Sequence, residues 1–132
     1  MDNRKIDRLI AVNKIIHEIA NRGRRFFYDQ RRNRYAQMVI EKHKVFFIDD
    51  YTGERVYAYN TGLNDHRGFS HGGTMWGLIN DFREFIVTGN HTNGNNGYGG
   101  LYCPHWGYPE EDMKAIRAVA KEVGFLKGEA NG

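Results

Sequence analysis

The spacing of apolar residues along the chain predicts three amphipathic helices. Over residues 3–22, apolar side chains recur every three or four positions, as they do on one face of a helix; they are Ile6, Leu9, Ile10, Val12, Ile15, Ile16 and Ile19. The same spacing predicts a second helix over residues 74–88, which Gly89 ends. A third is predicted over residues 109–123, because Pro109 suits the first position of a helix and an apolar face follows it.

The segment between the first two helices is predicted to form strands joined by turns. Residues 35–41 alternate between apolar and polar, the period of a strand with one buried face. Residues 45–48 are apolar throughout, which is typical of a central strand that is covered on both faces. Shorter strands are predicted at 24–28 and 55–59, and Gly53 favours a turn before the last of them. The pattern therefore predicts an α+β fold, in which an antiparallel meander of three or four strands packs with the N-terminal, middle and C-terminal helices.

The composition fits a single folded domain over residues 1–132. The chain is too short to divide into two good cores, and 40% of its residues are hydrophobic, which is enough for a packed interior. Cys103 is the single cysteine, which excludes an internal disulfide and a zinc site made of cysteines alone. No run approaches the ~20 apolar residues that cross a bilayer. We therefore expect a cytoplasmic protein with no membrane partner.

The positive charge is concentrated in the first third of the chain. Residues 1–44 hold twelve Lys and Arg against five Asp and Glu, a balance of +7, whereas residues 45–132 have a balance of −4. Such a one-sided field attracts polyanions such as nucleic acid, and Arg side chains fork onto phosphates. The candidate basic patch, with aromatic residues among its members, consists of Arg24, Arg25, Arg31, Arg32 and Arg34. A solvated basic face that keeps the protein soluble is the open alternative.

The strongest local signal is the Ser-His-Gly-Gly-Thr turn at 70–74, directly before the second predicted helix. The first amide N–H groups of a helix lack partners within it, and the helix dipole adds partial positive charge there. Two glycines let a ligand approach the backbone closely, so the turn is a candidate cradle for a phosphate or carboxylate. The candidate ligand-binding residues are Arg67, Ser70, His71, Gly72, Gly73 and Thr74. The alternative is a tight turn in which Ser70 or Thr74 only caps the helix.

The segment 90–108, which is rich in Gly and Asn, suggests two further hypotheses. Irregular loops longer than about 12–15 residues tend to be functional or disordered. Candidate anchors of a protein–protein interface are its aromatic residues Tyr98, Tyr102, Trp106 and Tyr108. His71, Cys103 and His105 are weak candidates for a zinc site, because their ligand types suit zinc but their spacing matches no recognised motif. We expect no metal and single out no catalytic residue, because turns and helix starts explain the adjacent carboxylates.

Several segments of the chain resemble small proteins of tailed bacteriophages and prophages. The resembling stretches are RRFFY at 24–28, FIDDYTG at 47–53, GFSHGGT at 68–74, FIVTG at 85–89 and WGY at 106–108. The resemblance covers most of residues 20–125. It implies a phage origin, and with it the host cytoplasm as location, but no established activity and no catalytic residues. By analogy with small phage accessory proteins, it implies binding to host machinery, including defence systems.

These observations together lead us to expect a non-enzymatic accessory protein of phage type that uses no cofactor. Its expected partner bears phosphate, either as nucleic acid or as a nucleotide signal, and its expected role is to counter host defence. The alternative is a protein–protein inhibitor that covers a host enzyme with the aromatic 90–108 loop, in which case the partner is a host protein such as a defence protein. A metal-dependent hydrolase is a remote alternative, and a homo-oligomer remains open.

Overall fold

The computed structural model describes residues 3–22, 26–58, 72–90, 101 and 108–126 of the 132-residue chain. In chain order, the elements are helix α1 (Asn3–Arg22), strands β1 (Tyr28–Asp29), β2 (Arg34–Tyr35), β3 (Gln37–Glu41), β4 (Lys44–Ile48) and β5 (Arg55–Tyr57), and helices α2 (Gly72–Thr88) and α3 (Glu110–Glu122). The predicted α+β class is confirmed. The first helix has the predicted bounds, and the second begins two residues earlier than predicted. The third is one residue shorter at each end, because Pro109 is its N-cap and Val123 its C-cap.

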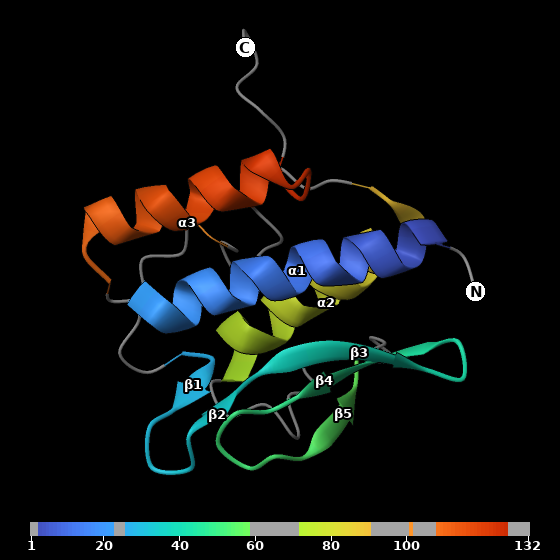
Figure 1. Ribbon diagram of the computed structural model, residues 1–132, viewed down its shortest axis with the longest axis horizontal. Helices are drawn as coiled ribbons and strands as arrows, with labels where there is room; N and C mark the ends of the chain where they lie inside the picture. The colour runs from blue at the N-terminus through green and yellow to red at the C-terminus, as the bar shows by residue number, and fades with distance from the viewer. Residues whose placement is uncertain (1–2, 23–25, 59–71, 91–100, 102–107, 127–132) are drawn as a thin grey trace, which may run out of the picture.

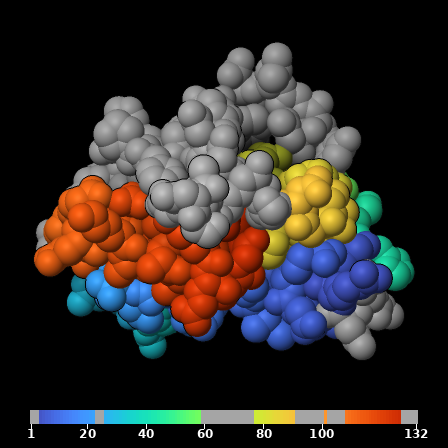
Figure 2. Space-filling model, turned by 90° about the horizontal axis from the view of Figure 1, so that it is seen from above, coloured from blue at the N-terminus to red at the C-terminus, as the bar shows by residue number. Residues whose placement is uncertain are grey.

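Helix α1 connects the other parts of the fold. It contacts α2, α3 and β3, and in Figure 1 the three helices lie above the strands, with α1 between α3 and the sheet. Seen from above in Figure 2, α3 and α1 adjoin, and the last turns of α2 lie beside them. An ion pair of 3.2 Å between Arg22 and Asp112 joins the end of α1 to the start of α3. The N-terminal helix is therefore the element against which the others pack.

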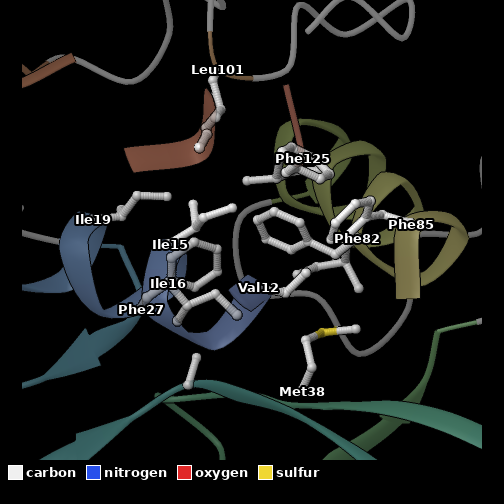
Figure 3. Packing of buried hydrophobic residues seen from close by; sticks show 14 of the residues in the cluster. Val12, Ile15, Ile16, Ile19, Phe27, Met38, Phe82, Phe85, Leu101 and Phe125 are labelled. Atoms are coloured by element: carbon white, nitrogen blue, oxygen red, sulfur yellow. The ribbon is translucent and has the colours of Figure 1, made fainter. Parts of the chain in front are cut away.

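One hydrophobic core is formed by side chains from all three helices and from the sheet. The predicted stripe on α1 contributes four residues that are 0% exposed, which are Val12, Ile15, Ile16 and Ile19. Aromatic rings from α2 meet Phe125, whose ring centroid lies 4.9 Å from that of Phe82 and 5.6 Å from that of Phe85 (Figure 3). Ile10, which the sequence placed in the stripe, is 62% exposed. At 100° per residue its position falls on the opposite side of the helix from the four buried residues, so it was wrongly included.

The strands form two small antiparallel sheets, one with the order β1-β2 and one with the order β3-β4-β5. The larger sheet is the predicted meander, with β4 at its centre. Ala36 separates the two sheets, and its N–H donates to the carbonyl of Phe27 at 2.8 Å. Lys42 and His43 link β3 to β4 with φ angles of 51° and 70°, as a two-residue turn of type I′ requires.

A side chain of α1 covers part of the edge strand β3. The amide nitrogen Nδ2 of Asn13 donates to the carbonyl of Met38 at 3.0 Å, and the N–H of Met38 donates to Oδ1 of Asn13 at 2.7 Å. The side-chain amide therefore occupies both backbone groups that a further strand would use at this residue. It fixes the helix to the sheet and prevents edge-to-edge pairing at that point.

Replacing Asn13 by alanine is expected to lower the free energy of unfolding by about 1–3 kcal/mol, because two partly buried backbone groups lose their partners. Urea denaturation measures this change. Asn21→Ala is the matched control on the same helix, since the hydrogen bond that Asn21 accepts from the hydroxyl of Tyr35, its one such bond within the described residues, is exposed. Equal losses in the two variants would contradict the role assigned to Asn13.

Candidate anion-binding surface

The turn between β1 and β2 presents two exposed arginines. Asp29 holds this turn, because its carboxylate accepts hydrogen bonds from the N–H of Arg32 at 3.2 Å and from Nη1 of Arg32 at 2.8 Å. Although burial raises the pKa of Asp29, these bonds from Arg32 outweigh it and keep that pKa below its ordinary value. The hydroxyl of Tyr28 donates to Oδ1 of Asn33 at 2.8 Å and closes the turn. Arg31 is also exposed, and no ion pair within the described part of the chain holds its guanidinium.

This turn packs against the turn between β4 and β5. The guanidinium carbon of Arg32 lies 4.8 Å from the ring centroid of Tyr51, which is 57% exposed. The guanidinium of Arg34 lies against Gly53, and its Nη1 is 3.4 Å from the carbonyl oxygen of Asp50. We call the resulting group of three cations and one ring the arginine cluster; it consists of Arg31, Arg32, Arg34 and Tyr51. The structure thus brings together the described members of the predicted basic patch.

Two neighbouring aspartates after β4 support this cluster in different ways. Oδ2 of Asp49 accepts hydrogen bonds from the N–H of Tyr51 at 3.0 Å and from the N–H and hydroxyl of Thr52 at 2.8 and 3.2 Å. Turn chemistry therefore explains Asp49, as the sequence suggested. It does not explain Asp50, which is 3% exposed and whose Oδ1 has no hydrogen-bond partner among the residues that the structure describes.

The buried carboxyl of Asp50 has a strongly altered proton affinity. Burial, followed by the negative charge of Asp49, raises the pKa of Asp50 to about 6 from its ordinary value of 3.8. The charge of Asp29 acts in the same direction, whereas the N–H of Asp50 itself and the guanidinium of Arg34 favour the ionised form. A carboxyl beside the arginine cluster therefore changes charge near neutral pH.

The predicted phosphate cradle lies at the start of α2. Gly72, Gly73 and Thr74 are the first three residues of this helix, so the two glycines are helical, and Thr74 lies too far inside the helix to be its N-cap. The N–H groups of these three residues are the ones that a helix cannot satisfy from within, and an anion at a helix start meets them. The side chains of residues 72–76 are not among those that the structure describes, so we treat the helix start and the arginine cluster as two candidate sites.

Most of the other predicted site residues lie outside the described residues; they are Arg24, Arg25, Arg67, Ser70, His71, Tyr98, Tyr102, Cys103, His105 and Trp106. Tyr108 is described and packs against the core, with its ring centroid 5.9 Å from that of Phe26. Within the ranges that the structure covers, no group of three or more His, Cys, Asp or Glu side chains is placed to hold a metal ion. No helix among the described residues is long and apolar enough to span a membrane.

The outer face of the β3-β4-β5 sheet is a surface that the sequence analysis missed. The prediction that β4 is covered on both faces is wrong, because Phe46 and Ile48 are only half-buried on the side away from the core. Phe46 pairs with Tyr57, which is 43% exposed, at 5.4 Å between ring centroids. Two cations lie over these rings, with Lys44 Nζ 5.6 Å from the Tyr57 centroid and the guanidinium carbon of Arg55 4.7 Å from the Phe46 centroid. The available signal was a charged residue two positions before each outward ring, Lys44 before Phe46 in β4 and Arg55 before Tyr57 in β5.

The fold and these surfaces define a small α+β protein that carries exposed arginines and aromatic rings at its strands and turns. The model of the YoqU family matches residues 2–131, and the chain belongs to this family. It is 42% identical over 123 residues to the "SPbeta prophage-derived uncharacterized protein YoqU" of Bacillus subtilis (strain 168), a match that covers 93% of this chain and 85% of that protein. The resemblance to phage and prophage proteins is thereby confirmed. No solved structure matches the chain.

Proposed function

We propose that this protein is a non-enzymatic accessory protein of phage type that binds a phosphate-bearing partner, either nucleic acid or a nucleotide signal. The observation that carries the proposal is the arginine cluster. Arg31 and Arg32 are exposed on one turn, and Arg32 lies over the exposed ring of Tyr51. Guanidinium groups beside an aromatic face match the two parts of a nucleotide, because the cation binds phosphate and the ring stacks on a base.

The three arginines of the cluster differ in how far a neighbouring carboxylate neutralises their charge, and this difference determines which arginine to replace. Asp29 pairs with Arg32, and Arg34 is packed against Gly53 beside Asp50. Arg31 is the described member whose charge is not offset in these ways, so it is the best placed to meet a phosphate. The first turn of α2 supports the proposal as a second place where an anion would be held by backbone N–H groups. A role against host defence follows by analogy with small phage proteins.

Replacing Arg31 by glutamate is expected to weaken binding of a fluorescently labelled single-stranded oligonucleotide about tenfold in low salt, and to flatten the dependence of affinity on salt. Fluorescence anisotropy measures both. Lys114→Glu is the matched control, since Lys114 is exposed on α3 and its reversal changes the net charge by the same amount. The proposal fails at this site if the two reversals weaken binding equally, because only overall charge would then matter.

The same titration tests the helix start through the double variant Gly72→Glu/Gly73→Glu. Carboxylates suit the first turn of a helix, so the fold is expected to remain intact while bound phosphate is repelled. A control with the same two added charges is Ile10→Glu/Ala118→Glu, at exposed positions of α1 and α3. Loss of binding in the first double variant alone assigns a phosphate to the start of α2. An inhibitor that binds protein through the 90–108 loop would depend far less on salt.

A further inference from the structure

The outer sheet face carries a row of apolar side chains that crosses all three strands. The register places Val39 opposite Phe46 and Phe46 opposite Tyr57, so these three residues lie side by side. Their neighbours along β4, Val45 and Phe47, are buried in the core. Because successive side chains of a strand point to opposite faces, the row faces away from the helices. In Figure 1 the helices lie on the other side of these strands.

Cations border this row and are in contact with its rings. Lys44 lies over Tyr57 and Arg55 lies over Phe46, while Arg55 also pairs with Glu41. Lys44 and Arg55 are both exposed, and Arg55 has a side-chain exposure of 51%. Each cation therefore sits where it can release its ring to a stacking partner and bind the adjoining phosphate instead. We call Lys44, Phe46, Arg55 and Tyr57 the sheet platform.

We propose that the sheet platform binds single-stranded nucleic acid by stacking bases on Phe46 and Tyr57 and by pairing phosphates with Lys44 and Arg55. This inference rests on the proposed function and names its partner. A sheet face with exposed aromatic rings beside cations supplies both the stacking surface and the charge that single strands require. An apolar protein partner would bury the ammonium group of Lys44 and the ion pair between Arg55 and Glu41 away from water, which is unfavourable. A duplex keeps its base faces stacked inside and offers none to the rings.

Strand β4 connects the platform to the arginine cluster. Strand β4 runs from Lys44 in the platform to Ile48, which leads directly into the turn that carries Tyr51. The four steps from Lys44 to Ile48 span about 13 Å at ~3.3 Å per residue, so the platform and the cluster lie within reach of a few nucleotides. A single strand lying along β4 meets rings at both ends and cations beside each ring. Its phosphates would then contact Arg31 at one end and Lys44 at the other.

The test compares two replacements of Tyr57 that differ in whether a ring remains. Tyr57→Leu keeps an apolar side chain but removes the stacking face, and is expected to weaken binding of a labelled 12-nucleotide DNA single strand about tenfold. Tyr57→Phe keeps the ring and is expected to bind within about twofold of the unaltered protein. Both variants are expected to bind the duplex of the same sequence weakly and with equal affinity. Urea denaturation of the free variants confirms that they are folded.

The outcomes separate the platform from the broader proposal. If Arg31→Glu weakens binding of the single strand but Tyr57→Leu does not, the platform is overturned and the phosphate-binding function stands. If the duplex binds as tightly as the single strand and responds equally to Tyr57→Leu, stacking is overturned. If neither nucleic acid binds in low salt, the platform and the nucleic-acid form of the proposed function fail together.

Discussion

Replacing Asp50 by asparagine is expected to stabilise the protein above pH 6 and to leave its stability almost unchanged near pH 4. The pKa of Asp50 is raised to about 6, whereas the ordinary value is 3.8. The folded protein therefore binds this proton more tightly than the unfolded chain does, and stability falls as pH rises from about 4 to 6. At about 1.4 kcal/mol per pKa unit, the loss at pH 8 has an upper limit of about 3 kcal/mol. Asparagine retains the shape of the side chain and removes this loss.

Urea denaturation at pH 4 and pH 8 measures the effect, and the neighbouring aspartate provides the control. Asp49→Ala removes the acceptor of the N–H groups of Tyr51 and Thr52, so it is expected to destabilise the protein by about 1–3 kcal/mol at pH 8. Adjacent carboxylates should thus give changes of opposite sign. A loss of stability in Asp50→Asn at pH 8 would mean that Arg34 stabilises the ionised carboxylate by more than burial disfavours it.

Replacing Gly53 by alanine is expected to lower the free energy of unfolding by about 2–3 kcal/mol. Gly53 has a φ of 73°, a conformation that costs a residue with a side chain about 1–2 kcal/mol. An added Cβ would also come within 2.4 Å of Nη1 of Arg34, so the guanidinium must move. Because Arg34 favours the ionised form of Asp50, its displacement is expected to raise the pKa of Asp50 further.

Gly124 allows the two contributions at Gly53 to be separated. Gly124 also has a positive φ, of 90°, but a Cβ added there would meet nothing within 4 Å. Gly124→Ala therefore measures the backbone cost alone, and the excess loss in Gly53→Ala measures the displacement of Arg34. Thermal or urea denaturation of both variants gives the difference. Equal losses would show that Arg34 moves aside without cost.

The helices were predictable because their apolar residues are regularly spaced and most of them pack into the core. Val12, Ile15, Ile16 and Ile19 of α1 are buried, and Gly89 and Gly124 follow their helices with φ angles of 82° and 90°. Ile10 was wrongly assigned to the buried stripe because the prediction counted every isoleucine of the helix, including one on the exposed side. The start of α2 was placed too late because two glycines read as a turn. Glycine is tolerated in the first turn of a helix, so Gly72 and Gly73 did not have to lie outside α2.

The candidate site was predictable only in part, because exposure depends on residues distant in sequence. The arginines of the turn between β1 and β2 followed from local composition. The contact between Arg32 and Tyr51 did not, since it joins two different hairpins. An apolar run such as β4 is compatible with a strand that is covered on both faces or on one face, and the run alone does not distinguish the two. The burial of Asp50 was not predictable either, because residues in turns are usually exposed and the sequence does not show what covers this one.

The central place of α1 has a consequence for how the protein is made. α1 leaves the ribosome before α3, against which it packs, because residues 23–109 must be synthesised in between. The nascent chain therefore carries an apolar helix whose partners are still missing, and contacts between such distant segments form late in folding. Until α3 emerges, the apolar stripe of α1 is exposed and accessible to chaperones and proteases of the cell that makes the protein.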